Sequence, residues 1–341
     1  MLKHLRGSLL LTLAGLVLGA LAGWTTHGTV EGVLHAVFIV SVLSVLEVSL
    51  SFDNAVINAT VLRDMTPVWR HRFMTWGILT AVVGMRVVLP LGIVAAIGGL
   101  SPVEVLVLAA TRPEEYGQIL GSAHVSVSAF GGAFLAMVGL KYFFDHEKDV
   151  HWIHVIETRL SQLGRIHSVE LGIVLVLLYA VSGQVEDGKQ LEFLVAGIFG
   201  LVTHIVVSGV GDLLGSAEAT TTHVVRSGLS SFLYLEVLDA SFSFDGVIGA
   251  FALSTNLMII AVGLGVGAMF VRSLTIMFVE RGTLTQFRYL EHGAFYAIIA
   301  LGVTMFLQAF LHVPEVISGL SGAAAIGLAL WSSVRYNRSH S

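Results

Sequence analysis

Four carboxylates, at equal spacing in two apolar stretches, are the residues of this chain whose types and positions could do chemistry. Residues 43–54 read LSVLEVSLSFDN and residues 235–246 read LEVLDASFSFDG, an offset of 192 with seven of twelve positions identical. Glu47 and Asp53 in the first stretch correspond to Asp239 and Asp245 in the second. Two Leu-, Val- and Ser-rich helices can look alike by composition, but composition does not place two acids six residues apart in both. We interpret the two stretches as an internal repeat.

The chemistry that these acids predict is the binding of a hard cation. An ionised carboxylate inside a membrane is costly unless it is paired, bound to a cation or protonated. Glu236 is a fifth acid in these apolar segments, which offer only two basic counter-charges. Oxygen ligands suit Mn²⁺, Ca²⁺ or Mg²⁺ better than Zn²⁺. The predicted ligands are Glu47, Asp53, Asn54, Asp239, Asp245 and Glu236, assisted by Ser51 and Ser243, with Arg86 and Arg272 balancing charge when no cation is bound.

The alternative is that the acids and arginines form structural pairs that hold helices together. The spacing also bears on local structure, because residues six apart on a straight α-helix differ by about 120° in direction. Glu47 and Asp53 would then not share a face. Serine, aspartate and asparagine side chains compete for backbone hydrogen bonds, so we expect a break in the helix within residues 49–54.

The elements that must position these residues are membrane helices. The chain has 341 residues, 55% hydrophobic and 12% charged, with a mean hydropathy of +0.85, whereas an ordinary soluble domain is about 25% charged. A net charge of −5 lacks the excess of basic residues that a nucleic-acid-binding protein carries. The absence of cysteine excludes disulfides and thiolate metal sites. Continuous apolar runs predict an all-α, polytopic bundle. Its expected spans are residues 8–23, 33–62, 74–100, 126–144, 168–183, 193–214, 229–253, 257–278, 293–311 and 315–332.

Loop charges predict the orientation of this single transmembrane domain, residues 1–341. Ten spans place 14 Lys and Arg residues in loops on one side and two on the other, so both termini are expected in the cytoplasm and the protein in the inner (plasma) membrane. The apolar run 102–111 is too short to span, and residues 1–23 also fit a cleavable signal, although an uncleaved helix is favoured.

In this topology the two motif spans run in opposite directions, which is typical of inverted-repeat transporters. We assign residues 33–144 to the first repeat, 145–168 to a cytoplasmic loop and 229–332 to the second repeat.

The paired motifs resemble the signatures of the TerC (tellurium-resistance) family of integral membrane proteins. The longer stretches DASFSFDGVIGAFALS, FFDHEKDVHWIHVIE and GVGAMFVRSLTIMFVERGTL resemble its branch known as domain of unknown function 475. TerC-like proteins are grouped with the LysE transporter superfamily, and several export Mn²⁺. The resemblance implies that the acids named above form the metal path. Gly246 is a departure, because the wider family usually has serine after the second aspartate.

Other patterns have simpler interpretations. Gly209-Val210-Gly211-Asp212 matches the GxGD pattern of intramembrane aspartyl proteases, but none of the five prolines begins the Pro-Ala-Leu segment that such a protease needs. His204 could relay protons or make one helix–helix hydrogen bond. In residues 145–157, Glu147 and His151 could bind a regulatory metal, but an interfacial amphipathic helix accounts for the same residues. The roles of Glu291 and His292 stay open.

The sequence therefore predicts a transporter rather than an enzyme. No phosphate-binding loop is present, so transport would use an ion gradient, most simply of protons. We expect a secondary transporter that exports a divalent cation, Mn²⁺ in the first place, with no catalytic residue, no cofactor, and the metal ion and the lipid bilayer as its partners. The alternatives are a non-transporting TerC-like scaffold in metal or tellurite stress and, more remotely, the protease.

Overall fold

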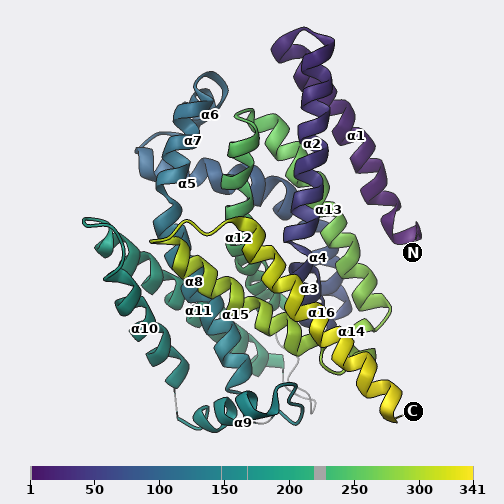
Figure 1. Cartoon of the computed structure of the whole chain (residues 1–341), viewed down its shortest axis with the longest axis vertical. Helices are drawn as coiled ribbons and strands as arrows, with labels where there is room; N and C mark the ends of the chain where they lie inside the picture. The colour runs from purple at the N-terminus through teal and green to yellow at the C-terminus, as the bar shows by residue number, and fades with distance from the viewer. Residues whose placement is uncertain (1, 147, 167, 219–227, 341) are drawn as a thin grey trace. The chain divides into compact units, whose positions relative to one another are not determined.

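The computed structural model describes residues 2–146, 148–166, 168–218 and 228–340, and in these ranges the chain forms helices and no strand (Figure 1). Contacts divide the chain into two compact units. Unit 1 comprises Met1–Ala55, Thr66–His124 and Leu235–Glu280, and unit 2 comprises Val56–Met65, Val125–Tyr234 and Arg281–Ser341. Each unit thus contains parts of both predicted repeats.

Unit 1 is built around three long helices that pack against one another: α1 (Leu2–His27), α2 (Val30–Leu50) and α13 (Leu257–Glu280). Small residues allow the backbones to approach closely. A methyl group added at Gly23 of α1 would lie 2.6 Å from the Gly32 carbonyl oxygen of α2. Ser44 of α2 donates a hydrogen bond to the Gly263 carbonyl oxygen of α13 at 2.9 Å. These contacts fix the helix that carries the first acidic motif.

The rest of unit 1 consists of shorter helices and most of α12 (Gly228–Leu253), which carries the second motif. The shorter helices are α4 (Pro67–Leu79), the π-helix η1 (Thr80–Val88), α5 (Leu89–Gly98), α6 (Pro102–Thr111) and α7 (Pro113–Ser122). Pro90 follows η1 and cannot donate a hydrogen bond to the preceding turn, a usual cause of helix distortion. Residues 102–111, predicted to be too short to span, form the ten-residue helix α6.

Unit 2 contains α8 (His124–Phe143), α9 (His154–Leu163), α10 (Val169–Ser182), α11 (Gln190–Glu218), α14 (Thr283–Gln286), α15 (Leu290–Gln308) and α16 (Glu315–His340), with most of α3 (Phe52–Arg63). α15 packs along α16, and α10 packs along α11. A buried core joins α8, α10, α11 and α15 through Ala133, Leu178, Phe193 and Phe306.

Seven helices in the described parts of the chain are long and apolar enough to cross a membrane: Arg6–His27, Val30–Leu50, Thr80–Gly98, His124–Phe143, Gln190–Gly209, Leu257–Glu280 and Leu290–Gln308. The expectation of an all-α, multi-pass membrane protein is therefore confirmed at this level. Of the other predicted spans, 168–183 forms a helix of 14 residues, and α12 and α16 are long but fall outside this group. The count of ten spans and the inverted repeat stay predictions.

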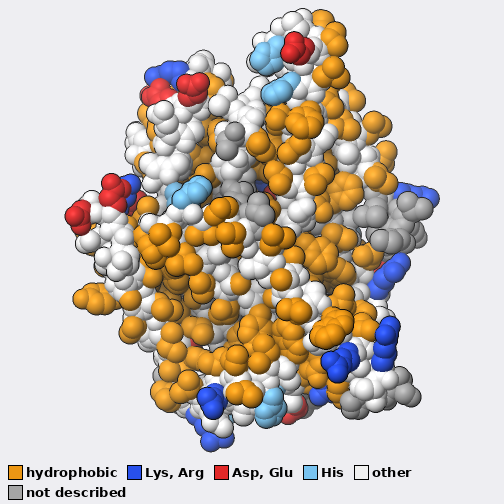
Figure 2. All heavy atoms as spheres, viewed as in Figure 1, with side chains coloured by type: hydrophobic (Ala, Val, Ile, Leu, Met, Phe, Trp, Pro, Cys, Tyr) orange, Lys and Arg blue, Asp and Glu red, His pale blue; other side chains and the backbone are white. Residues whose placement is uncertain are grey.

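The surface of these helices is largely apolar, as a lipid-facing surface requires. Leu10, Leu13 and Leu21 of α1 and Val176 of α10 are more than half exposed. In Figure 2, hydrophobic side chains cover much of the visible face, and charged side chains are confined to a few places. A water-soluble protein rarely exposes so much contiguous apolar area.

Candidate cation site

The first acidic motif lies at the break between α2 and α3, in the part of the chain that belongs to unit 1. α2 ends at Leu50, Ser51 leaves helical geometry with φ −103° and ψ 16°, and α3 begins at Phe52. The break predicted within residues 49–54 is therefore present. It separates Glu47, in the last turn of α2, from Asp53, in the first turn of α3. Glu47, Ser51 and Asp53 are all buried.

Glu47 occupies a narrow slot lined by a basic side chain and two glycines. Its Oε1 forms an ion pair with Nη2 of Arg86, on η1, and accepts a hydrogen bond of 3.1 Å from the Ser51 hydroxyl. A methyl group at Gly267 of α13 would collide with the Glu47 Cβ, and one at Gly246 of α12 would lie 3.4 Å from Oε2. Glycine at these two positions gives the carboxylate its space.

Arg86 is held on both sides of its guanidinium group. Its Nη2 pairs with Glu47, and its Nη1 donates a hydrogen bond of 2.6 Å to the carbonyl oxygen of Ala81, in the preceding turn of the π-helix. Its side chain is only 5% exposed. A buried pair of this kind is costly to break, because the remaining charge has no water to solvate it. Arg86 is thus the counter-charge of Glu47, and its role in balancing charge when no cation is bound stays a prediction.

Asp53 and Asn54 have side-chain oxygen atoms that no basic side chain contacts in the described part of the chain. Asp53 accepts a hydrogen bond of 3.0 Å from the backbone N–H of Asn54, and within the described residues it has no salt bridge. The Oδ1 atom of Asn54 is buried and has no hydrogen-bond partner in that part of the chain. Buried polar atoms are normally paired, so these two residues have capacity for a further ligand.

The second acidic motif lies on α12 within unit 1. Asp239, Ser243 and Gly246 follow an i, i+4, i+7 pattern and share one face of the helix, with Glu236 one turn earlier. At one end of this stripe, Gly246 lies beside Glu47. The Ser243 hydroxyl is buried and, among the described residues, has no hydrogen-bond partner. The backbone of Asp245 is helical, but its side chain lies outside what the structure describes.

Arg272 of α13 is the basic residue nearest the second motif. Its charge interacts with Asp239 and Glu236, and its guanidinium carbon lies 4.6 Å from the centre of the Phe73 ring. A methyl group at Gly77 would lie 2.9 Å from its Nη1 and 3.4 Å from Glu236 Oε1. As Arg86 does in the first motif, Arg272 lies beside the acids of the second.

The structure thus brings together part of the predicted ligand set. Glu47, Ser51 and Arg86 meet at the slot, and Gly246 of α12 lies beside them. Among the described residues, no three His, Asp or Glu side chains form a ready metal cluster. Because the Asp245 carboxylate is outside the described part, the complete ligand set stays a prediction.

Glu157 is a charged centre that sequence reasoning missed. It is completely buried in unit 2, where its carboxylate accepts hydrogen bonds from the backbone N–H groups of Trp152 (3.1 Å) and Ile153 (3.2 Å). Its Oε2 lies 3.3 Å from His292 Nε2, 3.6 Å from His151 Nδ1 and 3.7 Å from Lys148 Nζ. The only signal in the sequence was the cluster of His and acidic residues in 145–157.

The environment of Glu157 favours its charged form. Burial alone would raise its pKa, but the hydrogen bond and charge of His292, the Ile153 N–H and the nearby Lys148 outweigh burial and lower the pKa to about 2. The helix expected over 145–157 begins only at His154, because the preceding residues turn back to donate to Glu157. Trp152, in this turn, packs edge-on against Tyr296 of α15.

Of the other residues that the sequence singled out, His204 can be placed. His204 is buried in unit 2 and makes an edge contact with the Phe134 ring at 5.8 Å. Glu147, the partner proposed for His151 in a metal site, lies outside the described residues, as does the side chain of Asp212 from the GxGD pattern.

Comparison with known proteins identifies the family. A family model described as protein of unknown function (DUF475) matches residues 52–340. The chain belongs to the DUF475 family. No curated protein and no solved structure gives a significant match. The match begins at Phe52, the first residue of α3, and includes Asp53, Asn54 and all of the second motif. Most of the candidate site of this DUF475 protein therefore lies in the part shared with its family.

Proposed function

We propose that this multi-pass membrane protein is a secondary transporter that exports a hard divalent cation, with Mn²⁺ as the expected substrate and protons as the coupling ion. One observation carries the proposal: within the described residues, buried oxygen atoms without hydrogen-bond partners lie on both motifs, Asn54 Oδ1 and Ser243 Oγ, and the first motif also holds the buried Glu47–Arg86 pair. The TerC resemblance, in which several members export Mn²⁺, points in the same direction.

The charges support a cation rather than a neutral substrate. Arg86 compensates Glu47, which leaves Asp53 as a buried carboxylate met only by backbone N–H groups in the described structure. A buried anion needs a counter-charge or a proton. A divalent cation bound to Asp53 and Asn54 would supply that charge, and a proton would replace it after release.

The geometry also supports a site that can open. Ligands on a broken helix are typical of transporters, because backbone carbonyls freed at the break can join the coordination. Oxygen ligands of this kind favour Mn²⁺, Ca²⁺ and Mg²⁺. Gly246 of α12 lies beside the Glu47 carboxylate, and the residues of both motifs belong to unit 1.

Flux measurements in proteoliposomes test the proposal. We expect Mn²⁺ flux for the wild-type protein and at least a tenfold loss in Asp53→Asn and Asp245→Asn, because losing a charged ligand from a desolvated site costs on the order of 1.5–3 kcal/mol. The matched control is Asp187→Asn, in an exposed loop, which should keep full flux. Wild-type flux in a well-folded double mutant would refute the site, and a preference for Zn²⁺ would refute the oxygen-ligand argument.

A non-transporting scaffold is the second candidate, and the Glu47–Arg86 pair is the observation that favours it. If the acids serve only to hold helices together, the wild-type protein should give no Mn²⁺ flux in proteoliposomes, although Glu47→Gln still lowers its thermal unfolding midpoint. Flux of the folded wild-type protein therefore distinguishes the two functions.

A further inference from the structure

One exposed stripe of α16 is apolar along most of its length and basic at its C-terminal end. Its members are Ile317, Leu320, Leu328, Trp331, Arg335 and Arg338, and the four apolar ones are each more than half exposed. At 3.6 residues per turn, all six lie within a sector of about 80°. They therefore form a single face of the helix, on which two arginines continue the line of the apolar side chains.

The dimensions of this stripe match a membrane boundary. From Ile317 to Trp331 it covers about 21 Å along the helix axis, which is most of a hydrocarbon core about 30 Å thick. Tryptophan is enriched at the level of the lipid headgroups. Arg335 follows about one turn later, and its guanidinium carbon lies 5.8 Å from the centre of the Trp331 ring. With Trp331 at the headgroups, Arg335 reaches the level of the lipid phosphates.

Contacts within unit 2 add a third arginine at this end of α16. The last turns of α16 lie beside α14 (Figure 1), where Asn337 Nδ2 donates a hydrogen bond of 3.0 Å to the Gln286 carbonyl oxygen. Arg288 donates a hydrogen bond of 3.2 Å from Nη1 to the Tyr336 hydroxyl, and its guanidinium carbon lies 4.8 Å from the centre of that ring. The basic end of α16, as we call it, consists of Arg288, Trp331, Arg335 and Arg338.

The positive charge of the basic end has no acidic partner in the described part of the chain. Residues 331–341 include two arginines and no aspartate or glutamate. Among the described residues, none of the three arginines forms a salt bridge. Glu291, three positions after Arg288, pairs instead with Arg63 at 3.2 Å. An anion is therefore the ligand that this charge favours.

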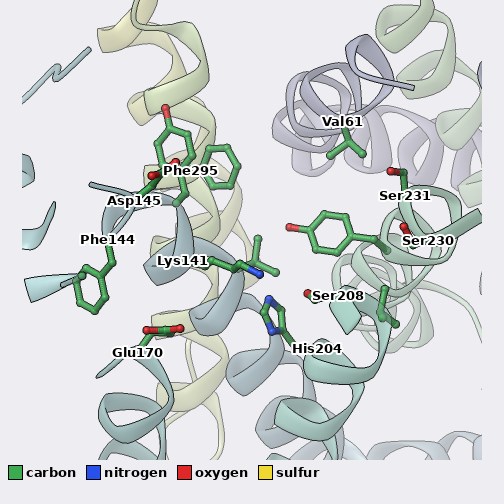
Figure 3. A pocket seen from close by; sticks show the side chains of 15 residues that line it. Val61, Lys141, Phe144, Asp145, Glu170, His204, Ser208, Ser230, Ser231 and Phe295 are labelled. Atoms are coloured by element: carbon green, nitrogen blue, oxygen red, sulfur yellow. The ribbon is translucent and has the colours of Figure 1, made fainter. Parts of the chain in front are cut away.

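Two other basic residues of unit 2 differ in this respect. Lys189 forms an ion pair with Glu186 at 3.0 Å. Lys141 lines a cavity of about 380 Å³ whose lining also includes Asp145 and Glu170 (Figure 3). An anion bound at either place would approach carboxylates, so the basic end of α16 suits an anion better than these two places.

We propose that the basic end of α16 binds the phosphate group of an anionic phospholipid from the bilayer. Guanidinium groups donate charge-assisted hydrogen bonds to phosphate oxygens, and clusters of basic residues next to a membrane helix attract anionic lipids. The acyl chains of the same lipid lie along the apolar part of the stripe. A soluble phosphate compound would leave that apolar part uncovered, which favours a lipid as the ligand.

Quenching of Trp331 fluorescence by brominated lipids tests the proposal at the site itself. Trp331 becomes the single emitter when the other four tryptophans are replaced by phenylalanine: Trp24, Trp69, Trp76 and Trp152. In phosphatidylcholine bilayers, phosphatidylglycerol with brominated acyl chains should occupy the surface around Trp331 at least fivefold more strongly than phosphatidylcholine with the same chains, because one basic residue near the membrane surface contributes roughly that factor.

A second measurement uses the protein with all its tryptophans. In detergent, added phosphatidylglycerol should raise the thermal unfolding midpoint in a saturable way, and phosphatidylcholine should raise it less. This measurement decides the question on its own if the protein with a single tryptophan does not fold.

Charge-removing substitutions show which residues bind the lipid. Arg335→Gln/Arg338→Gln should abolish the preference for phosphatidylglycerol in both measurements while leaving quenching by phosphatidylcholine unchanged. The matched control is Arg159→Gln/Arg165→Gln, which removes the same charge from two exposed arginines at and after the end of α9. It should keep the full preference.

Three results would overturn the inference. Equal quenching by the two lipids, or equal midpoints where quenching is not measurable, would show that no anionic lipid is selected. An equal loss of preference in the control variant would show that only net charge matters. Displacement of phosphatidylglycerol by inorganic phosphate would make the basic end a site for free phosphate. Because neither readout involves a metal ion, these results leave the proposed Mn²⁺ transport untouched.

Discussion

At the scale of single residues, the Glu47–Arg86 pair has the clearest energetic consequence. Both side chains are about 5% exposed or less, so removing one charge leaves the other buried and unpaired. We expect Glu47→Gln to lower the free energy of unfolding by about 3–5 kcal/mol. Unfolding in detergent, followed by circular dichroism, measures the change.

A second substitution tests the cause. Arg86→Met in the Glu47→Gln background removes the stranded charge and should recover most of the lost stability. If the double mutant is no more stable than Glu47→Gln, the pair does not carry the effect. Flux is expected to be lost in both variants.

At Gly246 a substitution is expected to strengthen Mn²⁺ binding rather than to weaken the protein. A methyl group at this position would lie 3.4 Å from Glu47 Oε2, an ordinary contact distance, so Gly246→Ser should fold with a stability within about 1 kcal/mol of the wild type. Its hydroxyl would add an oxygen beside the slot, and we expect tighter Mn²⁺ binding by calorimetry. Gly246→Ala is the control that adds the carbon without the oxygen, and it should leave Mn²⁺ affinity unchanged.

Glu157 predicts a pH dependence. Its pKa in the folded protein is about 2, below the value of about 4.3 for an unfolded chain. The stabilisation is therefore fully present above pH 4.3 and is lost as the pH falls toward 2. The protection factors of the amides in residues 148–163, which compare their exchange with that of an unstructured chain at the same pH, should fall over that interval. In Glu157→Gln the same protection factors should be lower at neutral pH and no longer change with acid, whereas the exposed Glu186→Gln should behave as the wild type.

At the scale of elements, glycine in α13 sets how closely α2 can pack. A methyl group at Gly267 would collide with Glu47 and lie 2.8 Å from the Ser44 carbonyl oxygen. Gly267→Ala should therefore cost about 1–3 kcal/mol as an overpacking substitution. Gly92 of α5 has open space around it, so Gly92→Ala should be neutral or slightly stabilising. Equal unfolding midpoints for the two variants would contradict the packing.

The sequence predicted the helix break but not the helix beside it. Clustered Ser, Asp and Asn side chains indicated a break within 49–54, and it occurs at Ser51. The π-helix at Thr80–Val88 was not predicted, because hydropathy does not distinguish i+4 from i+5 hydrogen bonding. Glu157 was missed for a different reason: His292 lies 135 positions along the chain, and no local pattern reports such a contact.

At the scale of the whole molecule, the number of spans decides where the C-terminus lies. If only the seven long apolar helices of the described residues crossed, the two termini would lie on opposite sides of the membrane, whereas the ten predicted spans would place both in the cytoplasm. Reporters fused after Arg72, within 145–165 and at the C-terminus should all read cytoplasmic, and one within 184–192 should read external. A C-terminal reporter on the outer side would contradict the ten-span topology. Finding 184–192 on the same side as 145–165 would contradict the antiparallel repeat.

The slot around Glu47 also determines which sequence changes the protein can accept. Saturation mutagenesis should find that position 267 tolerates almost nothing but glycine, that position 246 accepts only the smallest side chains, and that position 92 accepts many. The atoms that limit position 267 are the Glu47 Cβ and the Ser44 carbonyl oxygen, which shortening the acid to aspartate keeps. A larger residue at 267 should therefore not be rescued by Glu47→Asp, and only a shift of the α2 backbone could make room for it.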